Sequence, residues 1–179
     1  MLEKSKLYLQ NKFELCELPK VAKDRLPVYK FWYDVYHNEM KRKITDLNHS
    51  KQIIFDDLEP NSSLFCILNN KEIVGSVRLS DMVTIRNSYY MSMLKNVLHK
   101  NYIFLTKLII NKRYRKRGIS RELIRTAEEF THKLNRQYLV LDCNSYMVTY
   151  FEKLSFQLLT GVTVKSPHYG NVYLMLKEV

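Results

Sequence analysis

Residues 105–156 constrain the fold of this chain more than any other stretch. Two β-prone runs, residues 104–110 and 138–142, alternate with two segments of helical pattern, which begin after Gly118 and near residue 144. A basic turn joins the first run to the first helix. A strand that leads through a tight turn into a helix directs backbone N–H groups and the positive end of the helix dipole toward one point. This order therefore predicts a binding site for a pyrophosphate.

The turn itself is strongly cationic around a single glycine, Gly118. Glycine lets the backbone approach a phosphate closely and adopts unusual backbone angles without strain. A basic run alone is more often a solvated charge cluster or a localisation signal. Its position between a strand and a helix favours phosphate binding here. The cations of this turn are Lys112, Arg113, Arg115, Lys116, Arg117 and Arg121.

Two motifs in this region resemble a known family. The turn Arg115-x-x-Gly118-x-Ser120 resembles the Arg/Gln-x-x-Gly-x-Gly/Ala turn of the GCN5-related N-acetyltransferase (GNAT) superfamily, which holds the pyrophosphate and pantetheine of acetyl-CoA. Asn144, with Phe151 seven residues later and then Glu-Lys-Leu-Ser-Phe, resembles the superfamily's Asn-x6-Tyr-Glu-Lys-Leu-Gly-Phe segment. Two motifs in the right order, each at its expected strand–helix junction, imply an acyltransferase that uses a thioester.

The resemblance also implies a fold and a set of donor-binding residues. The fold is α+β: a mixed, mostly antiparallel sheet with helices on both faces, in which two middle strands splay apart around the thioester. An N–H near residues 108–110 would polarise the thioester carbonyl. The implied donor-binding residues are Leu108, Ile109, Ile110, Arg115, Lys116, Arg117, Gly118, Ile119, Ser120, Arg121, Asn144 and Phe151.

The periodicity of the remaining chain agrees with this fold. Helical spacing predicts helices over 25–41 and 88–98, and alternation predicts a hairpin of strands over 64–68 and 73–79. Two closing strands are expected over 156–164 and 172–177. Because no repeat or flexible linker divides the chain, we expect a single domain over residues 1–179.

Phe151 departs from the family pattern. Many members have a tyrosine at this position, whose hydroxyl protonates the departing thiolate, and phenylalanine has no acidic proton. Tyr146 and Tyr150 are nearby, but neighbouring positions on a helix face different directions. The sequence therefore assigns no general acid.

A looser resemblance covers residues 25–80 and concerns acyl-homoserine-lactone synthases and N-acyl amino acid synthases, branches of the same fold that take long acyl chains from carrier protein. It implies substrate-binding roles for Arg25, Tyr29, Trp32 and Arg78. A neutral amine is needed for acylation, so a carboxylate that accepts its proton is useful. Arg78, on an apolar strand, must pair with an acid or bind an anion. The candidate catalytic residues are Glu39, Asp56, Asp57 and Arg78, and for each carboxylate the alternative is a structural salt bridge.

Charge and cysteine content limit the kinds of partner and ligand that we expect for this chain. The net charge of +11 implies an acidic partner, and a phosphorylated donor, an acidic carrier protein, nucleic acid or an anionic membrane would each satisfy it. No apolar run approaches the roughly 20 residues of a membrane span. Cys16, Cys66 and Cys143 suit free thiols in the cytoplasm and form no metal-ligand set with the scattered histidines, so no metal is expected.

The resulting prediction is an N-acyltransferase that moves an acyl group from acyl-carrier protein or acyl-CoA to the amine of a small molecule, such as an amino acid or an amino-acid derivative. The donor's reactive arm would be acyl-phosphopantetheine in either case. One alternative is an acetyl-CoA-dependent acetyltransferase of a small amine or a protein lysine. Another is a catalytically silent module that binds nucleic acid or an acidic protein, although nucleic acid is the less favoured partner.

Overall fold

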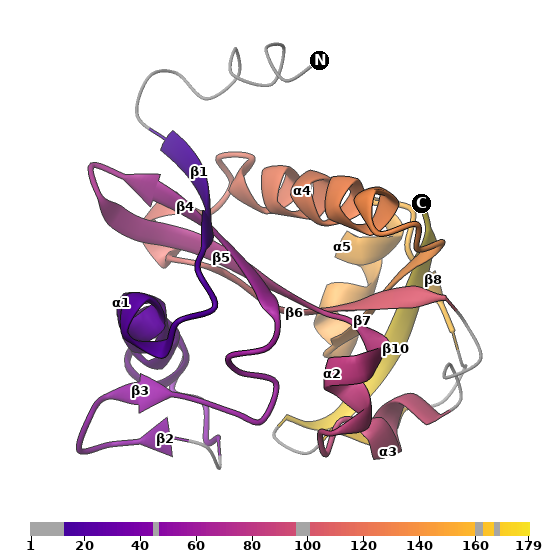
Figure 1. Cartoon of the computed structure of the whole chain (residues 1–179), viewed down its shortest axis with the longest axis horizontal. Helices are drawn as coiled ribbons and strands as arrows, with labels where there is room; N and C mark the ends of the chain where they lie inside the picture. Colours follow the sequence, from indigo (N-terminus) through magenta and orange to yellow (C-terminus); the bar gives the residue numbers. More distant parts are fainter. Residues whose placement is uncertain (1–12, 45–46, 96–100, 160–162, 167–168) are drawn as a thin grey trace.

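The computed structural model describes residues 13–44, 47–95, 101–159, 163–166 and 169–179. Its frame is one sheet in the order β1-β4-β5-β6-β7-β10-β8, with β9 paired to β10 (Figure 1). The short strands β2 (Leu47–Asn48) and β3 (Ile53–Ile54) form a separate hairpin. The strands of the main sheet are β1 (Phe13–Leu18), β4 (Ser63–Asn69), β5 (Glu72–Ser80), β6 (Tyr102–Ile110), β7 (Tyr138–Cys143), β8 (Gln157–Leu158), β9 (Val164–Ser166) and β10 (Gly170–Glu178).

Helices cover both faces of the sheet, as the α+β interpretation requires (Figure 1). On one face lie α4 (Ile119–Lys133) and α5 (Val148–Glu152). On the other face lie α1 (Ala22–Tyr33), which continues as a π-helical segment (Asp34–Glu39), and the short helices α2 (Met82–Arg86) and α3 (Met91–Leu94).

The middle of the sheet splays, and a bulge in β6 contributes to it. All neighbouring strands are antiparallel except β6 and β7, which pair in parallel only from Tyr102↔Tyr138 to Leu105↔Leu141. Opposite β5, Ser76 pairs with Ile109 but Arg78 pairs with Thr106, so β6 contains one additional residue. The backbone of Lys107 there has a φ of 52°, which is unusual for a side chain with a Cβ. Beyond Leu105, β6 therefore follows β5 and leaves β7.

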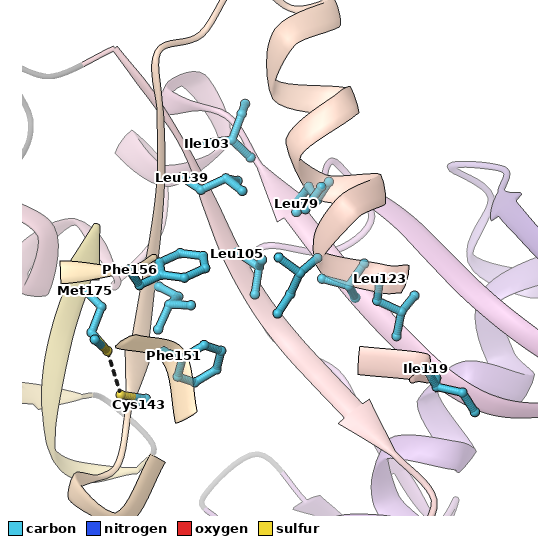
Figure 2. Close-up of a cluster of buried hydrophobic side chains, with 14 of the residues drawn as sticks. Leu79, Ile103, Leu105, Ile119, Leu123, Leu139, Cys143, Phe151, Phe156 and Met175 are labelled. Carbon is cyan, nitrogen blue, oxygen red and sulfur yellow. Dashed lines mark hydrogen bonds between the residues drawn. The ribbon is translucent and has the colours of Figure 1, made fainter. Parts of the chain in front are cut away.

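The core under α4 explains how the first turn of this helix is positioned. Ile119, Leu123 and Ala127 form the apolar stripe of α4 and are buried against the sheet. A Cβ at Gly75 on β5 would lie 2.8 Å from the side chain of Ile119, so glycine permits this close approach. Figure 2 shows Leu105 of β6 between Leu123 and the pair Phe151 and Phe156.

Several elements differ in extent from the sequence expectation. The first helix begins at Ala22 and changes to π geometry at Asp34. In the described part of the stretch expected to be helical over 88–98, the α-helix is α3, and residues 96–100 lie outside the described residues. The strand expected over 156–164 is replaced by β8 and β9, which are separated by residues of which 160–162 are not described. Within the described ranges, no helix is both long and apolar enough to cross a bilayer.

Candidate active site

A cavity of about 650 Å³ opens where β6 and β7 diverge. Its walls are β6 from Leu105 to Ile110, which pairs with β7 only at Leu105, and the end of β7, from Leu141 to Cys143. The π-helical segment contributes Val35 and Tyr36, and the first turn of α4 closes one end. The volume suits a small ligand or the reactive arm of a larger one.

The end of the cavity at α4 is suited to an anion. Gly118 is the N-cap of α4 with φ 82° and makes no side-chain cap hydrogen bond, so the first N–H groups of the helix are not capped by it. A Cβ at Gly118 would meet no atom within 4 Å, so glycine is needed here for backbone conformation and access rather than for packing. Lys116, Ser120 and Arg121 line the same end. Uncapped N–H groups, the helix dipole and these cations fit a pyrophosphate or a phosphopantetheine.

An acidic residue from the other side of the sheet holds this turn. The guanidinium of Arg115 forms an ion pair with Glu39, and its Nε donates to the carbonyl oxygen of Ile110 at 3.1 Å. The backbone N–H of Lys112 donates to Glu39 at 3.0 Å. Glu39, a candidate base from the sequence, thus lies outside the residues that line the cavity and contacts the turn instead.

Of the twelve donor-binding residues expected from the sequence, eleven line the cavity. The exception is Arg117, whose guanidinium lies 5.5 Å from the centre of the Tyr114 ring. Asn144 lines the wall and makes no cap hydrogen bond to the following turn. The eleven are Leu108, Ile109, Ile110, Arg115, Lys116, Gly118, Ile119, Ser120, Arg121, Asn144 and Phe151.

The two aromatic residues after Asn144 contribute differently. Phe151 is 5 % exposed, packs edge-on against Phe156 with ring centroids 5.7 Å apart, and presents only carbon to the cavity (Figure 2). Tyr150 also lines the cavity, and its hydroxyl lies 2.6 Å from Oγ of Ser120. Tyr150 thus brings a phenol against the first turn of α4.

The upstream candidates form a buried ionic network rather than a cavity wall. Arg78 makes two hydrogen bonds to Asp56, of 2.5 and 2.9 Å, and Arg25 pairs with Glu59 at 2.6 Å. All four side chains are buried, and Arg78 also approaches Glu59 at 3.5 Å. None of them lines the cavity. The sequence did not single out Glu59, although its place three residues after Asp56 is visible there.

The other upstream residues surround this network. The Tyr29 hydroxyl donates to Glu59 at 3.0 Å, and Trp32 Nε1 donates to Ser76 Oγ at 2.9 Å. Asp57 is exposed and accepts from the N–H of Tyr89 at 2.7 Å. Tyr29, Trp32 and Asp57 do not line the cavity either.

Lys107 connects the network to the cavity. Its side chain is 5 % exposed, lies 3.6 Å from Asp56 and donates to the Tyr169 hydroxyl at 2.7 Å. Burial opposes ionisation of Asp56, but Arg78 and Lys107 outweigh it and hold the pKa of this carboxyl well below its usual range. Asp56 is therefore a fixed anion at neutral pH, which makes it a poor proton acceptor.

An acidic residue that the sequence reasoning missed lines the cavity. Asp142 on β7 is half-buried in the cavity wall. Burial raises the pKa of its carboxyl to about 6, and Lys107, Arg42 and Arg78 partly oppose this rise. The available signal was a lone carboxylate within the apolar run 138–143, because burying a charge without a partner is costly.

A sheet whose parallel middle strands diverge beside an uncapped helix N-terminus defines the GNAT class of fold. Residues 29–156 match the Acetyltransferase (GNAT) family, and the chain belongs to this family. Its members are acyltransferases, so the chain is classed with the transferases. No curated protein matches the sequence.

Solved structures of the same fold include two amino-acid-related synthases. FeeM, an N-acyl amino acid synthase from uncultured soil microbes, superposes with a TM-score of 0.73 at 11 % identity, over 94 % of this chain and 91 % of that one. BjaI, a CoA-dependent acyl-homoserine lactone synthase, gives 0.71 at 10 % identity, over 93 % and 83 %. An acetyltransferase of the GNAT family from Staphylococcus aureus Mu50 gives 0.61 at 18 % identity, over 93 % and 98 %. At these identities the likeness concerns the fold alone.

Proposed function

We propose that this protein is an N-acyltransferase that passes an acyl group directly from a thioester to the amine of a small molecule, such as an amino acid or an amino-acid derivative. One observation carries the proposal: a single cavity joins the uncapped, cationic N-terminus of α4 to a polar end that contains Lys107 and Asp142. The donor phosphates would bind at the first end, and the amine would arrive at the second.

The chain's own groups suggest how each step proceeds. The pantetheine arm would run between β6 and β7, because the edge of β6 that faces β7 has no partner beyond Leu105. A backbone N–H among residues 108–110 would donate to the thioester oxygen as it gains negative charge. The neutral amine nitrogen attacks the carbonyl carbon, the C–N bond forms, the C–S bond breaks, and the nitrogen releases one proton to solvent. Because Phe151 offers no proton, the thiolate would take one from solvent.

The acceptor class draws support from the fold relatives. FeeM is described as an N-acyl amino acid synthase and BjaI as an acyl-homoserine lactone synthase, and both share this fold at TM-scores above 0.7. Free thiols at Cys16, Cys66 and Cys143 suit a reaction in the reducing cytoplasm.

For the donor, we propose acyl-carrier protein in preference to acyl-CoA. Carrier proteins are acidic, and recognising one requires a basic surface wider than a pyrophosphate site. Besides Arg115, which lines the cavity and pairs with Glu39, the turn offers five exposed cations, of which Lys116 and Arg121 line the cavity: Lys112, Arg113, Lys116, Arg117 and Arg121. Arg136 follows the C-terminal end of α4, so the length of this 15-residue helix, about 22 Å, separates it from the basic turn. Arg136 therefore does not extend the basic surface.

Kinetics with one acyl chain on both donors test this preference. We expect a higher kcat/KM with the carrier protein at low salt, and a preference that shrinks toward physiological salt, where the Debye length is about 8 Å. Arg113→Glu is expected to lower kcat/KM with the carrier protein about fivefold and leave acyl-CoA unaffected, because Arg113 is exposed outside the cavity. Lys133→Glu, at the far end of α4, is the matched control. Equal or better turnover with acyl-CoA at low salt would favour the acetyl-CoA-dependent alternative.

Phe151 gives a second prediction about the leaving group. If solvent protonates the thiolate, Phe151→Tyr should change kcat by no more than about threefold, although it restores the phenol of the family pattern. Tyr150→Phe should likewise leave the shape of the pH–rate profile unchanged. A basic limb that is present in the wild-type profile and absent in Tyr150→Phe would show instead that Tyr150 donates the proton.

A further inference from the structure

At the end of the cavity away from the α4 turn lie one acidic and one basic side chain, and neither forms an ion pair with another described residue. Asp142 on β7 and Arg42, which follows the π-helical segment, both line this cavity. The ion pairs formed among the described residues include neither side chain. Two opposite charges that share a cavity without pairing to each other suit a ligand that carries both signs.

Aromatic rings fix the position of Arg42. Its guanidinium carbon lies 5.2 Å from the ring centre of Tyr36 and 5.8 Å from that of Tyr169. Its Nη2 donates to the Tyr146 hydroxyl at 2.8 Å. A guanidinium has five N–H donors, so a fork remains for a carboxylate. Arg42 also lines a second hollow of about 410 Å³, together with Tyr146 and Tyr169, and therefore stands where the two hollows meet.

Asp142 is positioned to receive a proton. Val140 and Asp142 alternate with Leu141 and Cys143 along β7, so Asp142 faces away from the core under α4 and toward the side of Tyr169. Burial raises the pKa of its carboxyl to about 6, closer to neutrality than that of an exposed carboxyl. The charged and titratable groups that interact with its carboxyl are Lys107 on β6, Arg78 on β5, Arg42, Tyr36, Tyr90 and Tyr169, together with Cys143, which follows it in the chain and lies on the opposite face.

We propose that the acceptor is an amine that also carries a free carboxylate, with Arg42 holding the carboxylate and Asp142 accepting the proton of the amine. The assignment rests on the acyl transfer proposed above. The ammonium group of the acceptor gives a proton to Asp142, and the freed lone pair attacks the thioester carbon. As the C–N bond forms and the C–S bond breaks, the nitrogen loses its second proton to solvent and becomes the amide nitrogen. The thiolate departs and takes a proton from solvent, and Asp142 returns its own proton to solvent.

The test compares amino acids with the amines that lack only the carboxylate, for example leucine with 3-methylbutan-1-amine, using one acyl donor. We expect the wild-type protein to prefer the amino acid. Arg42→Gln should raise KM for the amino acid about tenfold and leave KM for the plain amine unchanged. Asp142→Asn should lower kcat about a hundredfold with both acceptors. It should also remove the acidic limb of the kcat/KM profile, which rises through about pH 6 as Asp142 ionises. Lys51→Gln, on an exposed side chain that does not line the cavity, should change none of these values.

Calorimetry of the amino acid without any donor separates failure of this assignment from failure of acyl transfer. Binding that is present in the wild type and lost in Arg42→Gln supports the carboxylate site even if no amine is acylated. The assignment is overturned if the plain amine is acylated as well as the amino acid, or if Arg42→Gln affects both acceptors equally. An absence of both binding and acylation overturns it as well. An acidic limb that persists in Asp142→Asn removes the role of Asp142.

Discussion

Arg78→Ala is expected to lower the free energy of unfolding by about 3–5 kcal/mol, because it leaves buried carboxylates without their cation. Arg78 is fully buried and makes two hydrogen bonds to Asp56 and one to Thr106. At pH 7 Asp56 is ionised, since Arg78 and Lys107 hold its pKa well below the usual range. Urea unfolding followed by circular dichroism measures the change.

Arg125→Ala is the matched control for this prediction. Arg125 also contacts two carboxylates, Glu122 and Glu129, but its side chain is 39 % exposed on the outer face of α4. Exposed ion pairs contribute about 0–1 kcal/mol. We expect the free energy of unfolding to fall several times more in Arg78→Ala than in Arg125→Ala. Equal losses in the two variants would contradict the assignment of Arg78 to a buried structural network.

Gly118→Val is expected to abolish or strongly weaken donor binding, by about 1.5–3 kcal/mol or more, which corresponds to roughly tenfold to a hundredfold in Kd. The substitution strains a backbone with φ 82° and places a branched side chain at the point where phosphate would approach. Arg115→Ala should weaken binding less, because Glu39 already pairs with this guanidinium. Calorimetry with CoA and with a phosphopantetheinylated carrier protein measures both effects.

Gly170→Val separates the loss of the site from backbone strain. Gly170 also has a positive φ, 74°, and a Cβ there would likewise meet nothing within 4 Å, but Gly170 begins β10, away from the α4 turn. The Gly170→Val variant should lose about as much stability as Gly118→Val and keep the wild-type affinity for CoA. If Gly118→Val binds both donors as tightly as Gly170→Val, the pyrophosphate site has been misplaced.

The central strand–turn–helix was predictable because its signals are local. The apolar stripe of α4, the glycine before it and the β-run ahead of it each follow from short-range periodicity and turn chemistry. The splay of β6 from β7 was implied by the family resemblance. No periodicity marks the bulge at Lys107, because it is defined by register against β5.

The acceptor end was harder to predict because its residues come from distant segments. Arg42 and Tyr169 meet only in the folded chain, and neither belongs to a motif. Lys107 and Asp142 did leave a signal, a lone charge in an apolar strand, which is the same signal that singled out Arg78. The sequence indicated that Arg78 needs an acid or an anion but did not distinguish a ligand site from an ionic network. That distinction depends on Glu59, whose contact with Arg25 spans 34 residues.

The most direct test of the central claim is a paired measurement of thiol release and amide formation. Purified protein is incubated with an acyl thioester and a panel of amino acids, while free thiol is followed by absorbance and products by mass spectrometry. We expect thiol release that requires an amine, matches N-acyl product one to one, and is lost in Gly118→Val. Thiol release without amide, or donor binding without any turnover across the panel, would contradict acyl transfer to an amine and favour a hydrolytic or catalytically silent protein.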